Sequence, residues 1–195
     1  MLKLNEPAFI SLLKEGDSKA YQYLIDAYKK TVYNICLNLL QNMEDAEDIS
    51  QEVFVSVFQS ISQFKGDSKL TTWLYRIAVT KSLDFIRMKK RKKRFGFMRS
   101  IFGDESNEPI YDQPNFSHPG VLLENKERTE ILFMAINKLP EKQKATFILN
   151  KLDQLSYLEV AEVMNISVSS VESLLFRAKQ NLQKTLSNYY NENER

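Results

Sequence analysis

Residues 45–94 limit the fold of this chain more than any other stretch. They begin with an acidic segment whose apolar residues recur at helical spacing, and a short polar loop around Gly66 then interrupts that spacing. An aromatic segment follows and runs into six consecutive cations, residues 89–94. The pattern predicts two amphipathic helices joined by a loop. Because one end is acidic and the other basic, two partners of opposite charge are expected, and a polyanionic nucleic acid suits the basic end.

The rest of the chain indicates an all-α fold. Only five Gly and five Pro occur in 195 residues, which favours helices over a turn-rich β architecture. We predict two small helical domains, residues 1–94 and 121–195, joined by a flexible linker, residues 95–120, that lacks hydrophobic periodicity. The formal charges of these three parts are +5, 0 and −3 respectively, so the positive field belongs to the N-terminal part.

Composition also limits the class of protein. No window approaches the ~18 apolar residues of a membrane span, and the N-terminus lacks a secretion signal, so a cytoplasmic protein without direct membrane insertion is expected. The single cysteine, Cys36, lies on an apolar stripe and is expected to fill the core. His118 has no Cys, Asp or His near it in sequence. Neither residue suggests a catalytic or metal site, so no enzymatic activity, metal or cofactor is expected.

Local chemistry predicts where several helices begin. A first helix is expected at about residues 7–15, and Asp17 is expected to cap the second. Asp45 is predicted to cap the third helix, and either Thr71 or Thr72 the fourth.

The C-terminal part has the pattern of a helix-turn-helix. Ser156 and Glu159 have the spacing of a capping box, Asn165 tolerates the positive φ of a tight turn, and Ser167 can cap a long second helix. The alternative is an ordinary helical hairpin in a bundle. In the DNA-binding interpretation, the second helix presents these residues to a major groove: Ser169, Ser170, Glu172, Ser173, Phe176, Arg177 and Lys179.

With both halves considered together, the chain resembles a sigma factor of bacterial RNA polymerase, of the small two-domain extracytoplasmic-function (ECF) group. The resemblance covers nearly the whole chain. It is carried by DAEDISQEVF (45–54), FKGDS (64–68), TWLYRIA (72–78), LP (139–140), LSYLEVAEVMNIS (155–167) and FRAK (176–179).

The resemblance implies roles for these segments. The residues implied in docking on core RNA polymerase are Asp45, Asp48, Gln51, Glu52 and Phe54. The loop 64–72 is implied in capturing a base flipped from the −10 element. The residues expected at the −10 DNA are Phe64, Lys65, Asp67, Ser68, Lys69, Trp73, Arg76 and Thr80, with Lys89, Lys90 and Arg91 on phosphates. The helix-turn-helix, from Ser167 onward, is implied in reading the −35 element.

The resemblance also implies partners, namely core RNA polymerase, promoter DNA and an anti-sigma factor, which can be membrane-bound. Several alternatives stay open at this stage. Trp73 is either a core aromatic or a wedge at the melted junction, and residues 89–94 are either phosphate contacts or a solvated helix end. A self-sufficient helix-turn-helix regulator is the second functional hypothesis, and a nucleic-acid enzyme the third.

Overall fold

The structure, a computed structural model, describes residues 6–101 and 126–193. Within these ranges all regular elements are helical, so the all-α prediction is confirmed. The elements are α1 (Glu6–Lys14), α2 (Ser18–Leu40), α3 (Met43–Ser60), the 3₁₀ turn η1 (Ile61–Gln63), α4 (Leu70–Ile101), α5 (Lys126–Asn137), α6 (Glu141–Lys151), α7 (Tyr157–Met164) and α8 (Val168–Asn193).

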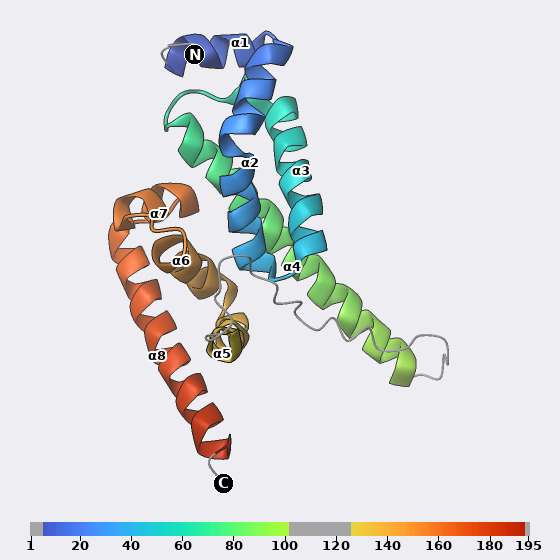
Figure 1. Ribbon diagram of the computed structural model, residues 1–195, viewed down its shortest axis with the longest axis vertical. Helices are drawn as coiled ribbons and strands as arrows, with labels where there is room; N and C mark the ends of the chain where they lie inside the picture. The colour runs from blue at the N-terminus through green and yellow to red at the C-terminus, as the bar shows by residue number, and fades with distance from the viewer. Residues whose placement is uncertain (1–5, 102–125, 194–195) are drawn as a thin grey trace.

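Helices α1–α4 form an N-terminal bundle. Helices α2, α3 and α4 pack against one another, and α1 crosses one end of the group (Figure 1). Val32, Cys36, Val53 and Leu74 are fully or almost fully buried at the centre of this bundle. Cys36 therefore fills the core as predicted, and burial raises the pKa of its thiol to about 11.

Helices α5–α8 form a C-terminal bundle in which α5, α6 and α7 all contact the long α8. Val171, Leu175, Ala178 and Leu182 recur at helical spacing and form the buried stripe of α8. Helices α7 and α8, joined by a short turn at Asn165, form the predicted helix-turn-helix.

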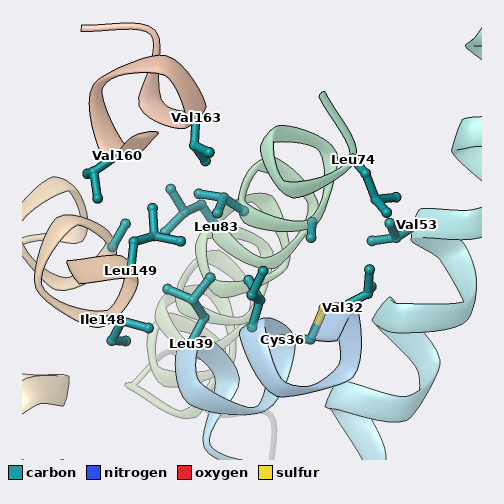
Figure 2. Close-up of a cluster of buried hydrophobic side chains, with 14 of the residues drawn as sticks. Val32, Cys36, Leu39, Val53, Leu74, Leu83, Ile148, Leu149, Val160 and Val163 are labelled. Carbon is teal, nitrogen blue, oxygen red and sulfur yellow. The ribbon is translucent and has the colours of Figure 1, made fainter. Parts of the chain in front are cut away.

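The two bundles pack directly against each other, α4 against α7 and α2 against α6. Figure 2 shows Leu39 and Leu83 of the N-terminal bundle facing Leu149, Val160 and Val163 of the C-terminal bundle. All five side chains are at most 7% exposed, so a continuous apolar core crosses the boundary between the bundles.

The division into domains at residues 94 and 121 stays a prediction, because residues 102–125 lie outside the described ranges. Helix α4 continues to Ile101, past the predicted start of the linker. Gly96 does not stop this helix, since one glycine inside a helix costs only about 1 kcal/mol relative to alanine.

The predicted caps had different outcomes. Asp17 caps α2, as expected, by accepting the Ala20 N–H at 2.7 Å. The prediction that Asp45 caps α3 is wrong, because Asn42 occupies that position and its Oδ1 accepts the Asp45 N–H at 2.9 Å. Gln41 has a left-handed backbone (φ 57°) that ends α2 and lets Asn42 follow in the extended conformation a cap requires.

The prediction for the start of α4 is also wrong. The helix begins at Leu70, before Thr71 and Thr72, and neither threonine caps it. A carboxylate from another helix does so instead, since Glu6 Oε1 of α1 accepts the Leu70 N–H at 2.7 Å. A sequence window around residue 70 contains no trace of a partner 64 residues away.

Candidate polymerase and nucleic-acid interfaces

The outer face of α3 is acidic and partly apolar. Asp48, Gln51 and Glu52 are all exposed there. Phe58 is 61% exposed, whereas Phe54, which the sequence analysis placed in the docking face, is half-buried against the core. Glu52 Oε2 lies 3.6 Å from Lys81 Nζ of α4, a distance at which the exposed pair gains little. The face therefore keeps carboxylates available to a partner.

The acidic and basic ends of the 45–94 stretch meet in the folded chain. Asp45 Oδ2 accepts from Lys89 Nζ at 2.6 Å, and the same ammonium lies 5.2 Å from the centroid of the Phe85 ring. Asp45 was predicted to contact polymerase and Lys89 to contact DNA, yet in the structure these two side chains hold α3 against α4. Asp45 is half-buried, so the exposed members of the predicted docking set are Asp48, Gln51 and Glu52.

The loop between α3 and α4 is supported from beneath by aromatic side chains. Phe64 is 5% exposed and packs on Trp73, with ring centroids 5.1 Å apart. Both rings belong to the packed interior, Trp73 only in part, so Phe64 supports the loop and does not present its face to solvent. Gly66 has φ +82°, the left-handed conformation that glycine adopts without strain. The exposed side chains of the loop are Lys65, Asp67 and Lys69, and Ser68 is half-buried.

The first turns of α4 face the C-terminal bundle. Arg76 Nη2 donates to the backbone oxygen of Glu162 in α7 at 2.7 Å. Thr72 Oγ1 donates to Glu162 Oε2 at 3.4 Å, and Thr72 is only 6% exposed. Thr80, one turn beyond Arg76, is exposed. Arg76 and Thr80 therefore lie on one helix, but only the Thr80 side chain is exposed to solvent without a partner from the C-terminal bundle.

The basic run is divided between ion pairs and solvent. Glu141 at the start of α6 accepts from Arg87 Nε at 2.8 Å and lies 3.5 Å from Lys90 Nζ. Arg91 and residues 92–94 are exposed on the outer surface of α4. Of the three cations expected on phosphates, Lys90 therefore pairs with the C-terminal bundle and Lys89 with α3, while Arg91 is exposed.

The helix-turn-helix is built as its sequence predicts. Ser156 Oγ accepts the Glu159 N–H at 3.3 Å while Glu159 Oε2 accepts the Ser156 N–H at 2.8 Å, a complete capping box. Asn165 takes the left-handed conformation (φ 53°) in the turn. Ser167 Oγ accepts the Ser170 N–H at 3.2 Å and starts α8.

Helix α8 presents one polar face to solvent. Its exposed side chains include Ser169, Glu172, Ser173, Phe176, Arg177 and Lys179, and Ser170 is half-buried. Phe176 is 64% exposed, so it belongs to this outer face and not to the core. The residues predicted to enter a major groove therefore share one accessible surface, apart from the partial shielding of Ser170.

Sequence reasoning missed the buried polar residues between the bundles. Asp153, just beyond the end of α6, accepts from Asn38 Nδ2 of α2 at 2.9 Å, and burial raises the pKa of its carboxyl to about 6. Lys144 is 6% exposed and donates to Asn137 Oδ1, and burial lowers the pKa of its ammonium to about 8. One sign was available in the sequence, since Lys144 precedes Ile148 by four positions and so shares its apolar face.

None of the described helices combines the length and apolar character that crossing a membrane requires. The described residues also contain no group of three or more His, Cys, Asp or Glu side chains placed to hold a metal ion.

Comparison with known families matches both bundles. Sigma-70 region 2 matches residues 24–92, and Sigma-70, region 4, matches residues 129–182. The chain is 34% identical to the ECF RNA polymerase sigma factor SigW of Bacillus subtilis over 181 residues, which cover 91% of this chain and 94% of that protein. It is 30% identical to the ECF RNA polymerase sigma-E factor of Escherichia coli over 180 residues, which cover 91% and 92% of the two chains.

Two solved structures resemble the fold. CnrH, in complex with the cytosolic domain of CnrY, has a TM-score of 0.63 at 18% identity and covers 94% of this chain and 97% of its own. RpoE of Bartonella quintana, in complex with the anti-sigma factor NepR, has a TM-score of 0.61 at 20% identity, with 87% and 98% covered. At these identities the likeness speaks for the fold alone.

Proposed function

The chain belongs to the ECF RNA polymerase sigma factors, and we propose that it binds core RNA polymerase, directs it to specific promoters and promotes melting of the −10 element. The observation that carries this function is the presence of both sigma-70 regions, in order, in a chain 34% identical to an ECF sigma factor over 91% of its length. A self-sufficient regulator would need no counterpart of region 2.

Residues 1–94 act as the region 2 domain, and α3 provides the polymerase contact. Asp48, Gln51 and Glu52 form an exposed polar strip beside the apolar Phe58. A strip of this composition suits a partner surface that is basic with apolar patches, because charge complementarity steers the encounter while buried apolar area stabilises the complex.

The loop before α4 captures the expelled −10 base. Flipping a base out of the stack costs a few kcal/mol, which a pocket that stacks and hydrogen-bonds the base offsets in part. The exposed Lys65, Asp67 and Lys69 supply polar groups over the firm support of Phe64 and Trp73. Thr80 continues this surface along α4, and Arg91 adds a phosphate contact. Arg76 lies on the same helix, and it joins this surface when the DNA replaces the Glu162 backbone oxygen as its partner. Melting in this scheme requires binding energy and no chemical step, so the protein is not an enzyme.

Residues 121–195 act as the region 4 domain and read the −35 element through α8. The serine hydroxyls at the start of this helix approach base edges and phosphates closely, and Arg177 and Lys179 suit phosphates or guanine. Glu172 repels phosphate unless it accepts a hydrogen bond from a cytosine amine, so it restricts which bases this helix accepts.

The chain works where polymerase works, in the cytoplasm, and an anti-sigma factor regulates it. This last proposal is supported by the two structural neighbours, which were solved in complex with CnrY and with the anti-sigma factor NepR respectively.

The test compares promoter opening with and without core polymerase, after start sites have been mapped by sequencing transcripts from overexpressing cells. We expect the purified chain alone to bind promoter duplex weakly, and the chain with core polymerase to open it, as followed by permanganate reactivity of unpaired thymines. Glu52→Lys should weaken core binding, with helix content by circular dichroism unchanged. The matched control is Glu15→Lys, an equal charge change at an exposed position outside α3.

Tight and sequence-specific binding by the chain alone would favour the self-sufficient regulator instead. Equal core affinity of the Glu52→Lys and Glu15→Lys variants would show that the docking face lies elsewhere.

A further inference from the structure

We propose that Glu6 of α1 is a positioning residue for the base-capture loop 64–72. Its hydrogen bond to the start of α4 holds the loop in the conformation that distinguishes one −10 base from another. The inference rests on the proposed function of this loop, but the hydrogen bond itself can be measured without DNA.

The start of α4 lacks a cap of its own. The Lys69 carbonyl accepts the first hydrogen bond of the helix, from the Trp73 N–H at 3.1 Å, so Lys69 occupies the N-cap position. A lysine side chain has three donors and no acceptor, so it cannot satisfy the free N–H groups of the first turn. Its charge also lies at the positive end of the helix dipole. The acceptor for the first N–H of α4 therefore has to come from elsewhere in the chain.

That acceptor is the carboxylate of Glu6, whose Oε1 accepts the Leu70 N–H at 2.7 Å. The bond is charge-assisted, and it places a negative charge at the N-terminus of α4, where the helix dipole favours one. Glu6 is itself exposed, so burial does not hold its side chain in place. The position of this carboxylate depends instead on how α1 is packed.

Helix α1 is anchored so that Glu6 reaches α4. Glu6, Phe9 and Leu13 are spaced three and four positions apart and share one face of α1. Leu13 is 1% exposed, and the Phe9 ring packs edge-on against Tyr23 of α2 with centroids 5.5 Å apart. The Glu6 carboxylate lies near enough to Tyr28 of α2 to raise the pKa of that hydroxyl, after the larger effect of burial. Helix α1 thus lies across the end of the bundle at which α4 begins (Figure 1).

The packing around the start of α4 leaves room on the α1 side. A pocket of about 440 Å³ lies between α1, α2 and the first residues of α4, and Glu6, Lys69 and Leu70 form part of its wall. The Leu70 side chain is buried in the core, but its backbone N–H is bonded to Glu6. Because close packing does not fill this side, loss of the hydrogen bond lets the end of the loop and the first turn of α4 shift.

The loop is held at two ends, and its predicted DNA contacts lie between them. Phe64 is buried against Trp73 at one end. Leu70 is held by Glu6 at the other. The exposed charged side chains between these ends are Lys65, Asp67 and Lys69. Hydrogen bonds to a base require accurate placement, whereas contacts to phosphates carry no sequence information. A shift at Leu70 therefore impairs recognition of the base more than attraction of the DNA backbone.

Three variants separate the hydrogen bond from the charge. Glu6→Gln keeps an oxygen that accepts the Leu70 N–H but loses the charge, whereas Glu6→Ala loses both. Glu15→Ala is the matched control, because it removes an exposed carboxylate just beyond the other end of α1 that accepts from Ser11 of α1 itself.

The first measurement is the exchange rate of the Leu70 amide hydrogen with solvent, by NMR of the full-length chain. We expect this amide to exchange about tenfold faster in Glu6→Ala than in the unmodified chain or in Glu15→Ala, because one charge-assisted hydrogen bond is lost. In Glu6→Gln the rate should stay within about threefold of that in the unmodified chain, since a neutral acceptor remains.

The second measurement is base discrimination in promoter opening with core polymerase. Opening rates are compared between the mapped promoter and the single-base −10 substitution that most slows opening by the unmodified chain. The ratio of the two rates should fall about fivefold in Glu6→Ala and stay within about twofold in Glu6→Gln and Glu15→Ala. A lost negative charge changes attraction to both promoters alike, and so does a smaller folded fraction, so neither effect alters this ratio.

Equal Leu70 exchange rates in Glu6→Ala and the unmodified chain would overturn the role of Glu6, and so would an unchanged ratio in Glu6→Ala. A ratio in Glu6→Gln as low as that in Glu6→Ala would also overturn it, because the charge and not the hydrogen bond would then matter. Failure of the unmodified chain with core polymerase to open the promoter would overturn the proposed function and this role with it. Normal opening with an unchanged ratio in Glu6→Ala would overturn only the role of Glu6.

Discussion

At the scale of single residues, Gly66 and Gly16 share a left-handed backbone conformation, Gly66 in the loop before α4 and Gly16 in the turn between α1 and α2. Their φ values are +82° and +80°, and a Cβ added to either would meet no atom within 4 Å. Alanine at each position should therefore lower the free energy of unfolding by a similar amount, about 1–2 kcal/mol, because only the left-handed conformation is penalised. We expect Gly66→Ala to impair promoter opening as well, since the strain falls in the base-capture loop, whereas Gly16→Ala should leave it unchanged.

Urea unfolding and permanganate reactivity with core polymerase check the two halves of this prediction. If both variants lose promoter opening equally, the loop conformation at Gly66 has no special role and the loss reflects stability alone.

Residues whose roles depend on their immediate neighbours were predictable from sequence. The capping box of Ser156 and Glu159 and the left-handed turn at Asn165 need only a few adjacent positions, and the structure confirms both. Asp153 was not predictable, because its burial and its partner Asn38, 115 positions away, exist only after the two bundles pack. Phe64 shows the same limit, since its place in the loop was recognised but its burial under Trp73 depends on how η1 joins α4.

At the scale of elements, the start of α3 can be tested through its cap. Asn42 accepts the Asp45 N–H, so Asn42→Ala should lower the free energy of unfolding by about 1 kcal/mol, while Asn42→Asp should retain most of it. Urea denaturation followed by circular dichroism measures both variants. An Asn42→Ala variant as stable as the unmodified chain would mean that another group caps this helix.

The helices themselves were predictable because their apolar spacing is strong, and the errors lie at their ends. Asn42 and Asp45 are both good capping residues, and sequence alone does not show that Gln41 turns the chain so that Asn42 takes the extended conformation. At α4 the capping group comes from Glu6 of another helix, so local propensity pointed to Thr71 and Thr72 instead. Helix existence follows from local pattern, whereas helix termini depend on how the chain enters and leaves them.

At the scale of the whole molecule, the contact between the bundles predicts an unusual dependence on pH. The pKa of Asp153 is raised by burial from 3.8 to about 6, beside Asn38, Cys36 and Tyr75. The folded chain, in which the two bundles are packed together, therefore binds the proton of the Asp153 carboxyl more tightly than the unfolded chain does. Burial of Asp153 therefore does not lower the free energy of unfolding below pH ~3.8, where the carboxyl is protonated in both states. The loss of stability grows as the pH rises to about 6 and reaches its full value, about 3 kcal/mol, above that pH.

The contribution of Lys144 to stability changes with pH in the opposite sense, because burial and the nearby Lys90 lower the pKa of its ammonium from 10.5 to about 8. Its destabilisation is complete below pH ~8 and disappears as the pH rises towards 10.5. Both groups are therefore charged between pH ~6 and ~8, so these two contributions weaken the contact most at neutral pH. Asp153→Asn should have a higher free energy of unfolding than the unmodified chain, as measured by urea denaturation. We expect this difference to be larger at pH 7 than at pH 5, by about 1.3 kcal/mol. Lys144→Met removes the buried ammonium, so the free energy of unfolding of this variant should change less between pH 8 and pH 10.5 than that of the unmodified chain. An Asp153→Asn difference that stays constant from pH 5 to pH 7 would mean that water reaches Asp153 in solution, and hence that the bundles are already apart at neutral pH.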